Sequence, residues 1–177
     1  MSMSFINRGL CAALLICGFC GAAFGDEVAF DKMKQLVRSR FPQVAQLSTA
    51  ELAEWLQTKS RAQPILLDVR TVEEFRVSHL RGAIQVDPAA KAADLVPVVR
   101  SGRPIVTYCS VGYRSSAVAE RLVKAGVPQV RNLEGSIFQW ANEGRALEAD
   151  GKPAAQVHPY NSTYGKMLNE AKRASVK

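Results

Sequence analysis

The protein has 177 residues, of which 47% are hydrophobic and 22% are charged, and its formal net charge is +7 at pH 7. This length suits one domain with its own hydrophobic core. The basic residues are scattered and are not interleaved with aromatic residues, so we expect no nucleic-acid-binding surface, although a positive field favours the recruitment of small anions.

The first 25 residues have the composition of a secretory signal peptide. Arg8 is the only charge before Asp26, residues 9–25 are apolar or small, and the segment ends in the small-x-small pattern Ala-Phe-Gly. We therefore expect cleavage after Gly25 and a periplasmic or secreted protein that is free of the membrane. A retained membrane anchor is the alternative, but the apolar run is diluted with Gly and Ala and is short for a spanning helix.

Cleavage at this position would leave one cysteine in the mature protein. Cys11, Cys17 and Cys20 lie in the expected signal peptide, and Cys109 remains. An exported protein with a single thiol has no internal disulfide to form, so Cys109 is either a reactive thiol or a buried, inert one.

The hydrophobic pattern predicts helices that alternate with short strands. Residues 26–41 have helical spacing and end at Pro42, and Ser48 and Glu51 form a capping box for the next helix. The remaining expected elements are strands at 44–47, 64–70, 82–86, 104–108 and 129–133, and helices at 72–77, 91–99, 116–124, 136–142 and 164–174. This alternation implies an α/β sandwich with a mostly parallel central sheet that is flanked by helices.

Chemically active residues follow two of the buried strands. Asp68 and Arg70 end one strand, and Cys109 directly follows another. Since the carboxyl ends of parallel strands meet at one edge of a sheet, Asp68 and Cys109 should share that edge. We expect Asp68 to accept loop N–H groups and Arg70 to pair with Glu74 or another carboxylate, so that both support the site.

The loop that begins at Cys109 is the strongest chemical signal in the chain. It joins a strand to a helix, where unpaired N–H groups and the positive end of the helix dipole stabilise a thiolate and bind an anion. Gly112 permits a tight turn, and Arg114 offers a forked cation. We predict Cys109 as a nucleophile for an anionic substrate. The predicted substrate-binding residues, whose amides can converge as an anion nest, are Ser110, Val111, Gly112, Tyr113, Arg114 and Ser115.

Histidine and metal chemistry are poorly supported. The chain has two histidines, His79 and His158, and neither is placed beside Cys109 by the sequence, so a Cys–His hydrolase is not favoured. The cysteines and histidines do not have the spacing of a zinc site, and we predict no metal ligands.

Several segments occur in the order found in one known family. They are Leu-Asp-Val-Arg at 67–70, residues 79–84, the run 106–115 that contains Cys109, Leu-Glu-Gly-Ser at 133–136, and Trp140. With these motifs the chain resembles the single-domain rhodanese-like proteins over residues 44–148. The resemblance implies a three-layer sandwich, with a helical segment at 26–43 and a C-terminal extension at 149–177 outside its common core.

The resemblance implies a thiosulfate sulfurtransferase, or rhodanese. Cys109 would take the outer sulfur from a small anionic donor such as thiosulfate and hold it as a persulfide. The acceptor would be thiophilic: cyanide, a thiol or a protein. No metal or organic cofactor is expected, because the sulfur is carried on Cys109 itself.

Three other functions remain open at this point. Cell-cycle dual-specificity phosphatases share the fold but place five residues between the cysteine and the arginine, whereas four lie between Cys109 and Arg114. A second possibility is a carrier or binding module that holds persulfide sulfur for a partner without turnover. A thiol redox protein is the third, and the absence of a second mature cysteine weakens it.

Overall fold

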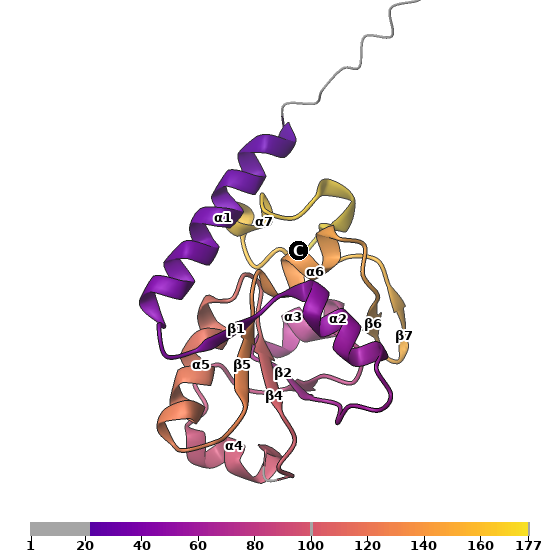
Figure 1. The fold of residues 1–177 in the computed structure, drawn as a ribbon. Coiled ribbons are helices and arrows are strands. Elements are labelled where there is room, and N and C mark those ends of the chain that lie inside the picture. Colours follow the sequence, from indigo (N-terminus) through magenta and orange to yellow (C-terminus); the bar gives the residue numbers. More distant parts are fainter. Residues whose placement is uncertain (1–21, 100, 177) are drawn as a thin grey trace, which may run out of the picture.

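The computed structural model describes residues 22–99 and 101–176, and its centre is a parallel sheet between two layers of helices (Figure 1). The strands of this sheet are β1 (Ala45–Leu47), β2 (Ile65–Asp68), β3 (Ile84–Gln85), β4 (Ile105–Tyr108) and β5 (Val130–Leu133). Their order is β1-β5-β4-β2-β3, and every neighbouring pair is parallel. The expected α/β fold with a parallel central sheet is therefore confirmed.

Helices cover both faces of the sheet. In chain order they are α1 (Ala22–Arg40), α2 (Thr49–Gln57), α3 (Val72–Val77), α4 (Ala92–Val99), α5 (Tyr113–Lys124) and α6 (Ser136–Asn142). Two separate groups of buried side chains fill the space between the layers, one with α2 and α6 and the other with α4 and α5. The arrangement is the three-layer sandwich that the sequence predicts.

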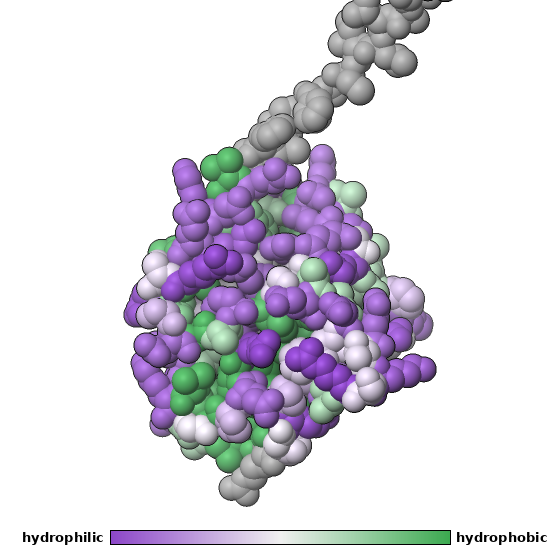
Figure 2. Space-filling view, viewed as in Figure 1, coloured by the Kyte–Doolittle hydropathy of each residue, from purple (hydrophilic) through white to green (hydrophobic). Residues whose placement is uncertain are grey.

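The strands reach both groups because successive side chains point to opposite faces of a sheet. Leu66 and Val106 belong to the core beneath α2 and α6, whereas Leu67 and Ile105 belong to the core beneath α4 and α5. Strands that are buried on both faces appear in the sequence as continuous apolar runs, as observed here. Most of the molecular face in Figure 2 is hydrophilic, with a hydrophobic area in its lower left part.

The N-terminal helix is longer than expected. Helix α1 begins at Ala22 rather than Asp26, so the predicted cleavage position after Gly25 falls within it. The predicted signal peptide otherwise lies outside the described residues. Among the described residues, the helices are all too short or too polar to cross a membrane. At its other end α1 stops at Arg40, and Phe41 is buried against the sheet.

The predicted helix at 164–174 is wrong. Its place is taken by two short pieces, α7 (Ser162–Gly165) and the 3₁₀ turn η1 (Glu170–Lys172). The Arg173 guanidinium, which follows η1, donates hydrogen bonds to the carbonyl oxygens of Gly165 (2.9 Å) and Leu168 (3.0 Å). These carbonyls would accept backbone N–H groups in a continuous helix, and the periodic pattern of side chains did not reveal that an arginine side chain binds them.

An antiparallel hairpin that the sequence analysis did not include follows α6. Strands β6 (Leu147–Ala149) and β7 (Lys152–Ala154) pair through a turn at Asp150 and Gly151, whose φ angles are +50° and +72°. Asp-Gly in this left-handed conformation is a common two-residue hairpin turn. The expected boundary between the domain and its extension, at residue 148, falls inside this hairpin.

Candidate active site

The loop at Cys109 is held by the beginning of helix α6. The Cys109 amide donates to Ser136 Oγ (3.2 Å), and the Cys109 carbonyl accepts from the amide of Ile137 (3.1 Å). The next carbonyl, that of Ser110, accepts from the amide of Phe138 (3.1 Å). Two orphan N–H groups of α6 are thereby satisfied, and the backbone on both sides of the cysteine is fixed.

The sulfur lies at the start of helix α5. The Gly112 amide donates to Cys109 Sγ over 3.2 Å, and α5 begins at the next residue, Tyr113, three residues earlier than predicted. Gly112 caps α5 without a side-chain hydrogen bond, at a φ of +105° that only glycine adopts without strain. Cys109 is 1% exposed, so it is buried but has an N–H group and a helix dipole directed at its sulfur. Cys109 also belongs to the core group with α4 and α5, so its surroundings are partly apolar, and the Gly112 amide is the donor that distinguishes it from an inert cysteine.

Arg114 is held in a network with Glu74 and Ser110. Arg114 Nη1 and Nη2 donate to the two oxygens of Glu74 (2.8 and 2.7 Å), and Nη2 also donates to Ser110 Oγ (3.0 Å). The Ser110 hydroxyl in turn donates to Glu74 Oε1 (3.0 Å). Glu74 Oε2 also accepts from the Thr71 amide (3.0 Å), which completes a capping box at the start of α3. One carboxylate therefore joins α3 to the cysteine loop.

The two charges of this pair shift each other's titration. Burial alone would raise the pKa of Glu74, but hydrogen bonds from Arg114 and the Thr71 amide lower it to about 2. Burial likewise opposes the charged form of Arg114, but its hydrogen bond to Glu74 and the negative charge of a Cys109 thiolate raise the pKa of Arg114 above its ordinary value. Both Nη atoms of Arg114 donate to Glu74, so this pair of donors is not directed at two oxygens of a substrate. Arg114 contributes its positive charge to the site instead.

The other predicted loop side chains support the loop. Ser115 Oγ donates to Asn132 Oδ1 (2.6 Å), and Val111 is buried in the core. Tyr113 is exposed, and its ring packs edge-on against Phe41 at 5.2 Å between centroids. With the side chains engaged in this way, the backbone amides are the groups of the loop that remain suited to binding an anion.

Asp68 and Arg70 form a fully buried ion pair at the same sheet edge. Asp68 stands in register with Tyr108, the residue before Cys109, as expected for neighbouring parallel strands. Arg70 donates to both Asp68 oxygens, through Nε (2.9 Å) and Nη2 (2.7 Å), and Nη2 also donates to the Ser78 carbonyl (2.6 Å). The Arg70 amide adds a bond to Asp68 Oδ1 (3.0 Å). We expected Arg70 to pair with Glu74 or with another carboxylate. It pairs with Asp68, and Glu74 binds Arg114 instead.

The histidines lie in other surroundings. His79 Nδ1 is 3.0 Å from the Phe75 carbonyl oxygen, and its ring stacks on the Phe75 ring at 3.8 Å. On its other side His79 Nε2 is 3.6 Å from a Glu148 oxygen. Within the described part of the chain, the His, Cys, Asp and Glu side chains do not form a cluster suited to a metal ion.

Glu74 and Ser136 are supporting residues that the predicted site lacks. Both had signals in the sequence. Thr71 and Glu74 have the spacing of a capping box, which places the Glu74 carboxylate at a helix start beside the sheet edge. Ser136 ends the Leu-Glu-Gly-Ser segment at 133–136, a glycine-containing turn after a strand. In the structure Gly135 and Ser136 have positive φ angles (+67° and +52°), and the Ser136 hydroxyl accepts the Cys109 amide.

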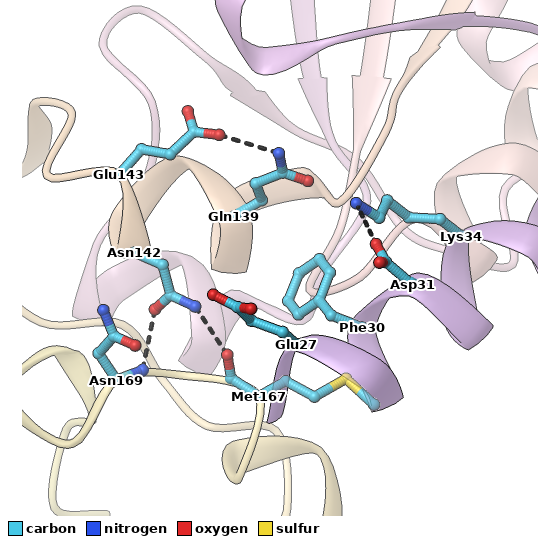
Figure 3. Close-up of a pocket in the computed structure, with 9 residues that line it drawn as sticks. All are labelled: Glu27, Phe30, Asp31, Lys34, Gln139, Asn142, Glu143, Met167 and Asn169. Carbon is cyan, nitrogen blue, oxygen red and sulfur yellow. Dashed lines mark hydrogen bonds and ion pairs between the residues drawn. The ribbon is translucent and has the colours of Figure 1, made fainter. Parts of the chain in front are cut away.

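A pocket of about 430 Å³ lies elsewhere, between α1, α6 and the C-terminal segment (Figure 3). Its lining includes Phe30 from α1, Glu143 from the end of α6 and Met167 from the C-terminal segment. The lining contains none of the predicted site residues, so this pocket is separate from the cysteine loop.

Residues 48–143, more than half of the chain, match the rhodanese-like domain family. The chain belongs to this family. Among its curated relatives, the adenylyltransferase and sulfurtransferase of Candida albicans is 30% identical over 92 residues, which are 48% of this chain and 21% of that protein. The tRNA uridine(34) hydroxylase of Staphylococcus epidermidis is 36% identical over 96 residues, which are 50% of this chain and 30% of that protein.

A solved rhodanese-like structure shows the same fold. The thiosulfate sulfurtransferase of Pseudomonas aeruginosa superposes with a TM-score of 0.56 at 22% identity, over 79% of this chain and 26% of that chain. The chain aligns with less than a third of each of these three proteins. The rhodanese-like family includes sulfurtransferases, but its domains also occur in proteins with other named activities.

We expect Glu74→Gln to remove a pH-dependent part of the stability. Glu74 has a folded pKa of about 2 against an ordinary value of 4.5, so its ionised form stabilises the fold. That contribution is complete above pH 4.5 and is lost as the pH falls toward 2, because the unfolded chain takes up the proton first. Urea unfolding of the wild type and Glu74→Gln should give free energies of unfolding that differ most at pH 6 and converge toward pH 3.

The exposed Glu54 provides the matched control. Glu54→Gln should change the free energy of unfolding by less than about 0.5 kcal/mol at either pH. A difference between wild type and Glu74→Gln that stays constant from pH 6 to pH 3 would contradict the ion pair described here.

Proposed function

We propose that the protein is a sulfurtransferase that carries sulfane sulfur on Cys109. The observation that supports this most directly is the position of Cys109 Sγ, which accepts the Gly112 amide at the N-terminus of α5, in a loop whose next residue, Ser110, binds the Arg114 cation. These groups stabilise negative charge on sulfur, both in the attacking thiolate and in the persulfide that follows.

The proposed reaction has two displacement steps. The Cys109 thiolate attacks the outer sulfur of thiosulfate, a new S–S bond forms, and the S–S bond of thiosulfate breaks as sulfite leaves with the electron pair. An acceptor such as cyanide then attacks the outer sulfur of the Cys109 persulfide. A C–S bond forms, the S–S bond to Cys109 breaks, thiocyanate leaves, and the thiolate is restored. No external oxidant or reductant is consumed.

The charge distribution supports a small anionic donor. The formal charge of the whole chain is +7, and the amides of the cysteine loop offer donors to sulfonate oxygens. A phosphatase of the same fold would need its arginine to hold phosphoryl oxygens. Here both Nη atoms of Arg114 are bound to Glu74, and the loop has four residues between Cys109 and Arg114, which favours sulfur over a phosphoryl group.

Replacement of Cys109 should abolish turnover and leave the fold intact. The purified wild type should form thiocyanate from thiosulfate and cyanide, and Cys109→Ser should fall to the uncatalysed rate, because a serine hydroxyl is a far poorer nucleophile at neutral pH. Since serine is nearly isosteric with cysteine, the melting temperature of the variant should stay close to that of the wild type.

Three outcomes of this assay are informative. Activity that persists in Cys109→Ser would show that the site is assigned wrongly. Background turnover by the wild type with a panel of donors would contradict an enzyme. A persulfide that forms on Cys109 without turnover would instead support the carrier function.

We also propose that the protein is exported to the periplasm or beyond, on the basis of residues 1–25. After expression of the full chain in a bacterial host, the intact mass of the exported protein should correspond to a chain that begins at Asp26. A mass that includes residues 1–25 in the membrane fraction would support a retained anchor, and retention of the full chain in the cytoplasm would contradict export.

A further inference from the structure

The C-terminal segment places an aromatic ring against the arginine of the cysteine loop. Arg114 Cζ lies 4.6 Å from the centroid of the Tyr160 ring. A guanidinium within about 6 Å of a ring centroid is attracted by the negative face of the ring. Tyr160 lies outside the residues that match the rhodanese-like family, so the extension of this chain contributes to the surroundings of the loop.

The segment that carries Tyr160 is fixed to the domain. The Asn142 side chain, at the end of α6, donates to the Met167 carbonyl (2.7 Å) and accepts from the Asn169 amide (2.9 Å) (Figure 3). Val157 is fully buried and exchanges backbone hydrogen bonds with Lys172 (2.8 Å) and Ala174 (3.0 Å). Tyr160 therefore lies in a segment that these hydrogen bonds hold in place.

The backbone at Tyr160 has an unusual conformation. Its φ angle is +64°, in the left-handed region that a bulky residue rarely adopts, and its amide donates to His158 Nδ1 (3.0 Å). The residue is 45% exposed, and its ring has an edge contact with the Tyr164 ring at 5.5 Å between centroids. Core packing does not explain an exposed ring on a strained backbone, and such strain commonly marks a functional position.

Arg114 is thus held from two directions. Glu74 and Ser110 accept hydrogen bonds from its Nη atoms, and its Cζ lies over the Tyr160 ring. Arg114 Nη2 donates to the hydroxyl of Ser110 (3.0 Å), the residue that follows Cys109. The guanidinium therefore lies at the cysteine loop, where its position affects which reagents approach Cys109.

We propose that Tyr160 is a positioning residue, whose ring holds the Arg114 guanidinium beside Cys109 so that the sulfur reacts preferentially with anions. This inference extends the proposed function, since it assigns the selection of anionic sulfur donors to the Tyr160–Arg114 contact. The ring face makes the contact, so the hydroxyl of Tyr160 is not required for it.

The test compares two alkylating reagents that differ in charge and is independent of sulfur transfer. Iodoacetate is an anion and iodoacetamide is neutral, and the modification of Cys109 is followed by the mass of its peptide. The ratio of the iodoacetate rate to the iodoacetamide rate should fall by about two- to fivefold in Tyr160→Leu, the change expected for a partly exposed cation–π contact. Tyr160→Phe keeps the ring and should keep the ratio.

The exposure of Tyr160 means that both variants should fold, which their melting temperatures would verify. An unchanged ratio in Tyr160→Leu, an equal fall in Tyr160→Phe, or a Cys109 that reacts with neither reagent would overturn the inference. For thiosulfate turnover we expect Tyr160→Leu to raise KM with little change in kcat. A wild type that prefers iodoacetate but forms no persulfide would leave the role of Tyr160 standing and contradict the proposed function.

Discussion

The contact between Glu74 and Arg114 is the interaction on which the candidate site depends. It joins the segment after β2 to the loop after β4, two parts of the chain that are 40 residues apart. The Glu74 side chain is 2% exposed and that of Arg114 is 23% exposed, so loss of Arg114 would leave a buried carboxylate without its cation, which is costly. The Glu74 carboxylate also caps α3, so the start of that helix and the position of the Arg114 cation are set together.

The fold explains why this contact forms where it does. Parallel strands bring Asp68 and Tyr108 into register, and the segments that leave β2 and β4 therefore begin side by side. Helix α6 then contributes amides of its first turn to the carbonyls of Cys109 and Ser110, while Gly112, the residue before α5, directs its amide at the sulfur. Two helix N-termini thus act on one short loop, and both favour negative charge there.

Much of this could be read from the sequence, because it depends on local patterns. Continuous apolar runs predicted the buried parallel strands, and Gly112 after Cys109 predicted a tight turn at a strand end. Local patterns did not show two features. The sequence left the Arg114 guanidinium available to a substrate, whereas Glu74, 40 residues away, binds it. The pattern at 164–174 predicted a helix, whereas Arg173 binds the carbonyl oxygen of Gly165 there. The early start of α5 at Tyr113 was missed because its cap is a left-handed glycine rather than a serine or threonine.

The proposed chemistry requires that one buried sulfur atom, Cys109 Sγ, be reactive where it accepts the Gly112 amide. The most direct measurement is the mass of the Cys109 peptide after the purified protein is incubated with thiosulfate and then with cyanide. We predict that thiosulfate adds the mass of one sulfur atom to this peptide and that cyanide removes it with the appearance of thiocyanate. A Cys109 peptide whose mass is unchanged by thiosulfate and by other sulfane-sulfur donors would contradict the account.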